Sequence, residues 1–321
     1  MKLFDVFNGD ADGICALHQM RLAQPAETEL VTGVKRDISL VKNVDAKEGD
    51  KVLVLDISLA KNIKAVEKLL ARGCQIQYFD HHLPGELPES SLFSSVIDTS
   101  SDTCTSLLVN EHLNQQYVLW AIVAAYGDNM LASAERLADL NGLSLEQKTQ
   151  LNELGVFINY NGYGALLSDL HFEPAQLYQA IKPYADPFDF ISNESVFKDL
   201  KTGYLQDMSN AESLQPDIST SKTAIFILPA EKWCRRVSGV LGNDLSNKFP
   251  DRAHALLTVI EGGYQVSVRA PQTNKKGAGD LCSQFDSGGG REGAAGINLL
   301  QESDKQRFID SFIHQYSRTA I

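Results

Sequence analysis

The sequence lacks the segments that would place a protein in a membrane. No apolar run approaches the ~20 residues that a membrane-spanning helix requires. The first residues, Met1-Lys2-Leu3-Phe4-Asp5, turn acidic almost at once and have no long apolar core, which argues against a signal peptide. The five cysteines are an odd number with no CxxC pair, so neither a disulfide framework nor a zinc knuckle is expected. We therefore expect a reduced, cytoplasmic protein that is not bound to a membrane.

The sequence also has fewer basic than acidic side chains, 29 Lys and Arg against 41 Asp and Glu. The net charge is −12, whereas a general nucleic-acid clamp would be basic. The imbalance is uneven, because residues 1–220 carry a net charge of −15 and residues 221–321 one of +3. This split suits a metal-holding part followed by an anion-holding part, although a chance distribution of solvated charge explains it equally well. A chain of 321 residues is long enough for two domains.

The first part of the chain alternates between strands and helices. Residues 2–7, 51–55 and 74–79 are predicted as strands. The last alternates polar and apolar side chains, and the continuous aliphatic run at 51–55 is typical of a strand buried on both faces. Helical patterns follow, and residues 134–184 look helical throughout. This order predicts an α/β fold in which residues 1–190 form a mostly parallel sheet with helical cover.

Each of these three strands ends in acidic or imidazole side chains. The first runs into Asn8-Gly9-Asp10-Ala11-Asp12-Gly13, the second ends at Asp56 and the third at Asp80-His81-His82. Taken singly, each is most often a helix cap or a polar turn. The carboxyl ends of parallel strands meet at one edge of a sheet, however, and carboxylate oxygen with imidazole nitrogen suits a divalent ion. Together they predict a metal site. An EF-hand is excluded, because no glutamate closes a twelve-residue loop.

A second α/β pattern occupies the end of the chain. We assign residues 191–220 as the linker and residues 221–321 as a smaller substrate-binding domain. Its glycine-rich stretch, Ser287–Gly296, matches neither a P-loop nor a dinucleotide fingerprint. Small residues let backbone N–H groups approach an anion, and Arg291 adds a bidentate donor, while the alternative is a flexible linker. Lys35-Arg36, after another predicted strand, is either a phosphate contact or a solvated turn.

Together these motifs resemble the DHH-family phosphoesterases. Four stretches have the order and spacing of the family's motifs: Asn8–Gly13, Leu55-Asp56, Asp80-His81-His82 and Gly127-Asp128. A fifth, Gly288–Gly296, is similar to the signature of the DHHA1 domain that follows in many members. It covers nearly the whole chain, with residues 134–220 least constrained. The set of motifs is specific, although no single motif is.

The resemblance implies an N-terminal DHH domain, a C-terminal DHHA1-like domain and two divalent ions, usually manganese, with magnesium as the alternative. In the first domain it implies that Asn8 and Asp10 bind the first ion, that Asp12, His81 and Asp128 bind the second, and that Asp56 bridges both. It further implies two catalytic residues: His82, directed to the substrate phosphate, and Asp80, which orients its neighbours. For substrate binding it adds Arg269, Gly288, Gly289, Gly290 and Arg291, beside Lys35 and Arg36.

Three positions depart from the family pattern. Many relatives place a histidine where Val6 stands, and the RecJ-like pattern has an aspartate at Asn8. Asparagine is an uncharged, weaker ligand, so the first ion is expected to bind loosely or to need the substrate. The DHHA1 signature usually has histidine where Arg291 stands. Arginine keeps phosphate binding but cannot act as a general acid near neutral pH.

The function expected from these residues is hydrolysis of phosphodiester bonds in short oligonucleotides or small nucleotides, cyclic ones included, by a two-metal mechanism. A nucleotide or short single-stranded oligonucleotide is the expected partner, because binding a long polymer depends on many phosphate contacts. A homodimer is compatible with the sequence. Two alternatives stay open: a pyrophosphatase or polyphosphatase, and a non-catalytic nucleotide-binding protein that has lost the first ion.

Overall fold

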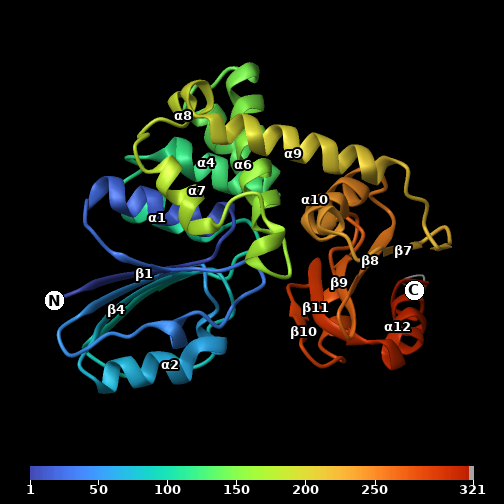
Figure 1. Ribbon diagram of the computed structural model, residues 1–321, viewed down its shortest axis with the longest axis horizontal. Coiled ribbons are helices and arrows are strands. Elements are labelled where there is room, and N and C mark those ends of the chain that lie inside the picture. The colour runs from blue at the N-terminus through green and yellow to red at the C-terminus, as the bar shows by residue number, and fades with distance from the viewer. Residues whose placement is uncertain (318–321) are drawn as a thin grey trace. The chain divides into compact units, whose positions relative to one another are not determined.

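The computed structural model describes residues 1–317 and divides the chain into two compact units, Met1–Thr202 and a second that begins at Gly203 (Figure 1). The division falls within helix α9 (Ser195–Glu212). The interval 191–220, assigned above to a linker, therefore contains an 18-residue helix. Within residues 1–317, no helix is long and apolar enough to cross a membrane.

The first unit is built on a five-stranded sheet whose neighbouring strands all pair in parallel, in the order β2-β1-β3-β4-β5. The strands are β1 (Leu3–Phe7), β2 (Glu29–Val31), β3 (Lys51–Leu55), β4 (Gln75–Asp80) and β5 (Phe93–Ile97). Phe7 pairs with Leu55 and Leu55 with Phe79, so the three central strands end level. The residues that follow them therefore meet at one edge of the sheet.

The central strand β3 is buried on both faces, as its aliphatic run predicted. Val52 and Val54 lie in a core with Val66 and Leu69 of helix α2 (Leu59–Ala71), whereas Leu55 is buried outside this cluster. Figure 1 shows α2 on one side of the sheet and helices α1, α4 and α7 on the other. The helices of this unit besides α2 and α9 are α1 (Ala11–Ala23), α3 (Thr105–His112), α4 (Val118–Gly127), α5 (Leu131–Leu140), α6 (Leu145–Gly162), α7 (Pro174–Ile181) and α8 (Pro187–Asn193).

Helix α4 is apolar along its length and is buried from Trp120 to Gly127. It packs against α1 and α6. A Cβ atom on Gly127 would stand only 2.7 Å from the backbone oxygen of Gly155 in α6, so glycine is required for this close approach. Asp128 follows directly and is carried by the end of this tightly packed helix.

The second unit contains a mixed six-stranded sheet in the order β10-β11-β9-β8-β7-β6, in which β7 and β8 pair in parallel and the other pairs are antiparallel. Its elements are β6 (Ile218–Ser219), β7 (Thr223–Leu228), α10 (Lys232–Lys248), β8 (Ala253–Ile260), β9 (Gly263–Arg269), α11 (Ala278–Cys282), β10 (Gly288–Gly290), β11 (Ala294–Gln301) and α12 (Lys305–Ser317). The core joins the sheet to α11 and α12 through residues such as Val266, Leu281 and Phe308.

The glycine-rich stretch, predicted as an anion-binding loop, is partly a strand. Gly288, Gly289 and Gly290 pair with Ile297, Gly296 and Ala295 as the edge strand β10. Because an edge strand pairs on one side only, part of its backbone still faces away from the sheet. A binding role for these glycines stays a prediction.

Candidate metal centre

Asp56 lies at the centre of the candidate site. It follows β3 and adopts a left-handed backbone conformation, with φ of 58°, which non-glycine residues seldom adopt. Its backbone N–H donates to the carbonyl of Phe79 at 3.0 Å, which holds the turn against β4. The carboxylate is buried, and its Oδ1 accepts a hydrogen bond from the Thr105 hydroxyl at 3.2 Å. This turn aims a carboxylate across the ends of the neighbouring strands.

The His81 imidazole is oriented as a metal ligand would be. Its Nδ1 lies 3.1 Å from the carbonyl oxygen of Thr103, which can only accept, so Nδ1 carries the proton. In the neutral ring Nε2 then has the lone pair that binds a metal, and it lies 3.3 Å from Asp56 Oδ1 and 3.9 Å from Asp12 Oδ2. A histidine fixed through one nitrogen with the other facing carboxylates is the usual arrangement at metal sites.

The Asp12 carboxylate is held by the start of helix α3. Thr105 N–H donates to Oδ2 at 2.8 Å and Ser106 N–H to Oδ1 at 2.7 Å. The start of α3 therefore binds an anion, and this anion is the chain's own aspartate. Each carboxylate oxygen has a second lone pair, so these bonds leave Asp12 able to bind a metal ion.

The side chains at this edge form two groups with metal-ligand spacing, and His81 belongs to both. Asp12, His81 and Asp128 make one group, and Asp56, His81 and His82 the other, with the ligand atoms of each group within 4.8 Å of one another. We call Asp12, Asp56, His81 and Asp128 the His81 corner. Hard carboxylate oxygens with one imidazole nitrogen fit a divalent ion such as Mn²⁺.

Burial and mutual repulsion disfavour charge on these carboxylates. Burial is the largest cause that raises the pKa of Asp12, although His81 and the Ser106 N–H act against it. The pKa of Asp56 is raised well above its usual range, first by burial and then by the negative charges of Asp12 and Asp10. A bound cation would offset both causes, which is the electrostatic reason to expect one here.

Asp80 orients both histidines and is not one of the four ligand candidates of the His81 corner. It is fully buried, and its Oδ1 accepts from the His81 N–H at 2.9 Å and binds His82 Nδ1 at 2.7 Å. The His82 side chain is 36% exposed. Burial lowers the pKa of His82, but the hydrogen bond and charge of Asp80, with help from Asp56, outweigh it and raise the pKa above its usual value.

Lys35 lies among the acidic side chains rather than in solvent. Its Nζ is 2.5 Å from Asp10 Oδ2, 3.2 Å from Asp128 Oδ1 and 2.9 Å from Asn159 Oδ1. Burial lowers the pKa of Lys35, but Asp10, Tyr163 and Asp128 together raise it well above its usual value. We call Asn8, Asp10, Lys35 and Asn159 the Lys35 corner. The sequence had assigned Lys35 to the substrate phosphate, and that role stays a prediction.

The substrate-binding candidates of the second unit lie on its sheet. Arg269 ends β9, and its guanidinium donates to Asn243 Oδ1 at 2.8 Å and to the Ser267 hydroxyl at 3.1 Å. Arg291 follows the edge strand, and its backbone N–H donates to the carbonyl of Ala294 at 2.9 Å. Arg36, the remaining candidate, is half-buried beside Lys35 in the first unit.

Four contributors to the site are outside the residues predicted above to bind metal or substrate: Thr103, Thr105, Ser106 and Asn159. The first three belong to the hydroxyl-rich segment at the start of α3, whose composition is typical of a helix start but does not indicate Asp12 as the partner. Asn159 lies near the end of helix α6, and no local signal marks it.

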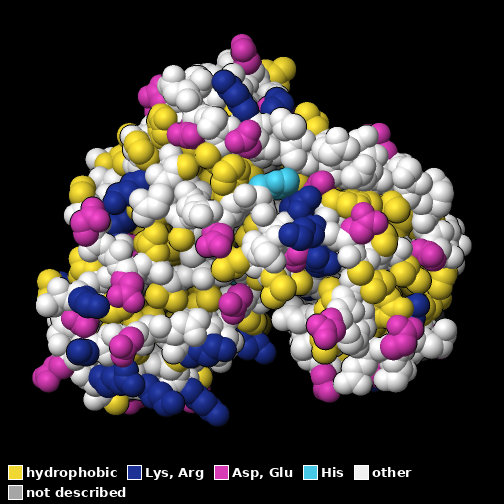
Figure 2. Space-filling view, viewed as in Figure 1, with side chains coloured by type: hydrophobic (Ala, Val, Ile, Leu, Met, Phe, Trp, Pro, Cys, Tyr) yellow, Lys and Arg dark blue, Asp and Glu magenta, His cyan; other side chains and the backbone are white. Residues whose placement is uncertain are grey.

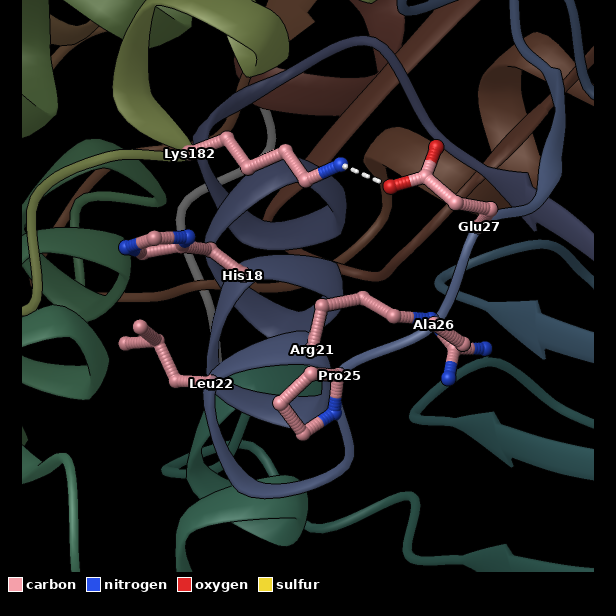
Figure 3. A pocket seen from close by; sticks show the side chains of 7 residues that line it. All are labelled: His18, Arg21, Leu22, Pro25, Ala26, Glu27 and Lys182. Carbon is pink, nitrogen blue, oxygen red and sulfur yellow. Dashed lines mark hydrogen bonds and ion pairs between the residues drawn. The ribbon is translucent and has the colours of Figure 1, made fainter.

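Two hollows in the first unit lie away from the His81 corner. One, of about 250 Å³, is lined by residues of the C-terminal half of α1 and by Lys182, which is 3.4 Å from Glu27 (Figure 3). The other lies against α2, and its lining includes Lys61, Lys64 and Lys68. Figure 2 shows Lys and Arg side chains gathered over this part of the surface. Neither hollow is lined by a group of metal-ligating side chains among residues 1–317.

Solved structures resemble this chain over almost its whole length. RecJ from Thermus thermophilus in complex with Mn²⁺ is 16% identical, with a TM-score of 0.66 over 99% of this chain and 52% of that chain. The DHH domain of a member of a family of ribosomal proteins is 12% identical, with a TM-score of 0.65 over 98% of this chain and 86% of that one. The chain has the fold of the DHH-domain proteins.

This DHH fold also occurs in PggH, a pGpG-specific phosphodiesterase from Vibrio cholerae, which is 12% identical with a TM-score of 0.53 over 98% of both chains. No model of a protein family matches the sequence, and no curated protein does. The predicted α/β class with two sheet-containing parts is confirmed. At these identities the likeness concerns the fold, so activity has to be argued from the site.

Proposed function

We propose that this chain is a metal-dependent phosphoesterase that hydrolyses phosphodiester bonds in short oligonucleotides or small nucleotides, cyclic ones included. The observation that supports this most is the His81 corner: three carboxylates and one oriented imidazole meet at the carboxyl edge of a parallel sheet. In open α/β sheets this edge is where ligands bind. The likeness to RecJ bound to Mn²⁺ and to a pGpG phosphodiesterase supports the same chemistry.

Asp12, Asp56, His81 and Asp128 would hold the divalent ion. Such an ion lowers the pKa of a bound water and stabilises charge on phosphoryl oxygens. The protein's task is to keep each donor in place: the start of α3 fixes Asp12, Thr105 steadies Asp56 and the Thr103 carbonyl sets the His81 tautomer. These contacts keep the ligands in position before the ion arrives.

His82 is the proposed catalytic cation. Asp80 accepts a hydrogen bond from Nδ1 of His82 and raises the pKa of His82. This favours the imidazolium form, in which Nε2 also carries an N–H. This N–H is suited to hydrogen-bond a phosphoryl oxygen as negative charge develops on it in the transition state. Asp80 acts through both histidines and is therefore a positioning residue.

The second unit would bind the remainder of the substrate. The Arg269 guanidinium donates to the neutral groups of Asn243, Ser267, Val268 and Gly239, so its positive charge is not cancelled by them. A guanidinium binds phosphate with two parallel hydrogen bonds. Arg291 and the backbone of Gly288, Gly289 and Gly290 are the further candidates. A homodimer stays a prediction.

The substrate class can be tested with a panel of dinucleotides, cyclic dinucleotides, pyrophosphate and single-stranded DNA in the presence of Mn²⁺. The proposal expects mononucleotides from the dinucleotide, and no product from Asp56→Asn under the same conditions. Cleavage of pyrophosphate alone would replace it with the pyrophosphatase alternative. Binding of nucleotide without cleavage of any substrate, with any divalent ion, would favour a non-catalytic nucleotide-binding protein.

A further inference from the structure

We infer that the Lys35 ammonium is a fixed cation that takes the place of one of the two metal ions expected at this site, so that the chain binds one divalent ion. The inference refines the metal centre of the proposed function. The sequence placed the first ion at Asn8 and Asp10, and in the structure it is Lys35 that bonds to Asp10. The contacts, the anchoring and the charge balance of the Lys35 corner each support this view.

The contacts of Lys35 use the whole capacity of its head group. An ammonium has three N–H donors, and Nζ has three oxygen partners: Asp10 at 2.5 Å, Asn159 at 2.9 Å and Asp128 at 3.2 Å. A metal ion that bound Asp10 would need its oxygen at about 2.0–2.6 Å. An ion on that oxygen would stand next to the ammonium, and the two positive charges would repel each other.

The backbone of Lys35 is anchored as well as its head group. Its N–H donates to the carbonyl of Gly162 at 2.8 Å, and its carbonyl accepts from Asn8 Nδ2 at 3.3 Å. Gly162 and Asn159 both belong to α6, so one helix contacts both ends of this residue. A long, flexible side chain held in this way loses much of its freedom, and its position is defined.

Asn8 fits this arrangement better than an aspartate would. Its amide nitrogen donates to the Lys35 carbonyl, whereas a carboxylate at the same place would put two acceptors face to face. Its Oδ1 is buried and has no hydrogen-bond partner among residues 1–317. The amide N–H of Asn8 thus positions Lys35, whereas its buried Oδ1 stays open to a donor or a cation.

Charge balance also favours a single ion. Asp10, Asp12, Asp56 and Asp128 are the carboxylates of the two corners and carry four negative charges when ionised. Two divalent ions and the ammonium would exceed that charge by one. One divalent ion and the ammonium bring the two corners within one charge of neutrality, and they avoid placing a second dication on Asp10 beside the ammonium that would repel it.

Counting bound metal tests this directly and needs no substrate. Protein equilibrated with saturating Mn²⁺ and freed of excess is analysed by elemental mass spectrometry, and its electron paramagnetic resonance spectrum is recorded. We expect one Mn²⁺ per chain with the signal of an isolated ion. Two ions per wild-type chain, or the signal of a coupled pair, would overturn the inference.

Variants show whether Lys35 is the cause. Lys35→Gln removes the charge at similar length, and the double variant Asn8→Asp, Lys35→Gln adds the missing carboxylate. We expect the double variant to bind two Mn²⁺ per chain, while Lys182→Gln, at the exposed pair with Glu27, stays at one. If a folded double variant also binds one, Lys35 does not exclude the second ion and the inference fails; if neither variant folds, the wild-type count decides.

The outcome is independent of activity. A wild-type chain that binds one ion but hydrolyses no substrate would contradict the proposed function and leave this inference standing. A chain that hydrolyses phosphodiesters with two ions bound would support the proposed function and overturn this inference.

Discussion

The two units of this chain place their functional side chains by different means. In the first, parallel strands end level, so residues from distant parts of the sequence, such as Asp12, Asp56 and His81, converge at one edge. In the second, antiparallel pairing alternates strand ends, and among the described residues it holds no comparable group of metal-ligating side chains. A parallel sheet therefore gathers ligands for a metal, whereas the mixed sheet offers separate donors such as Arg269. The comparison predicts that changes in the first unit affect turnover and metal binding, and changes in the second affect substrate affinity.

The largest effect is expected from Asp56→Asn in the first unit. We expect kcat to fall by roughly a thousand-fold or more, because the ligand shared with His81 and His82 loses its charge. The metal-free protein should be no less stable, since burial and neighbouring aspartates already disfavour that charge. Melting curves with and without Mn²⁺ check both points. A folded variant that kept its activity would refute the assignment of Asp56 as a ligand.

Acid should destabilise both units through buried histidines. Burial lowers the pKa of His18 in α1 to about 4, and burial with the charge of Arg252 lowers that of His254 in β8 to about 4. An unfolded chain binds this proton at about pH 6.5, so the stability contributed by neutral His18 is present above that pH and lost as the pH falls toward 4. The loss between pH 7 and pH 4 amounts to about 3 kcal/mol for His18.

The variant His18→Gln isolates this contribution, because its amide can still donate to the Tyr184 carbonyl that His18 contacts at 2.7 Å. Chemical denaturation at pH 7.5 and pH 5 should show a smaller pH dependence for the variant than for the wild type. Equal slopes would mean that His18 is not neutral in the folded protein.

A smaller effect is expected from Asp80→Asn. The variant weakens the hydrogen bonds from His82 Nδ1 and from the His81 backbone N–H without changing a ligand side chain. Changes of this kind cost about 10–100-fold in metal affinity or activity. The pH profile distinguishes positioning from bulk stability. Loss of the negative partner should move the His82 limb of the rate profile to lower pH, and an unshifted profile would argue against the proposed role.

The smallest effect is expected in the second unit, from Arg291→Ala. A charge-assisted hydrogen bond to phosphate contributes on the order of 1.5–3 kcal/mol, so KM should rise by roughly tenfold or more with kcat little changed. Arg307→Ala, at an exposed pair with Asp304, is the matched control. If Arg291→Ala lowered kcat instead, the division of labour between the units would be wrong.

The sequence predicted most of the His81 corner because its signals are local. Asp56, Asp80 and His81 stand at the carboxyl ends of predicted strands, and the paired strands bring them level. The position of the Lys35 ammonium was not predictable in this way. Residues 32–38 form no helix or strand, so no periodicity says where that side chain points. Its partner Asn159 lies near the C-terminal end of helix α6, where the residues are buried on all sides of the helix. The sequence pattern therefore does not indicate which face of this helix meets the site.

The glycine strand shows a second limit of pattern reading. Strands are recognised from side chains that alternate in polarity, and Gly288, Gly289 and Gly290 have none. Their pairing is determined by the partner strand β11, which contains the apolar residues at Ile297–Leu300. The turn between the two strands is so short that the sequence does not distinguish β11 from the glycine-rich stretch before it. Helix α10 likewise begins at Lys232, although the sequence alone predicts its start only at Ser238, because Lys232–Val237 is half polar and the N-cap residue Glu231 makes no capping hydrogen bond.

The left-handed backbone at Asp56 has a consequence for the evolution and engineering of this protein. Glycine would adopt φ of 58° without the penalty of about 1 kcal/mol or more that another residue meets there, and it would also remove a buried carboxylate. Asp56→Gly should therefore raise the melting temperature while it abolishes metal binding at the His81 corner. Selection for stability alone would replace this aspartate, so its retention in a library is itself a marker of selection for function.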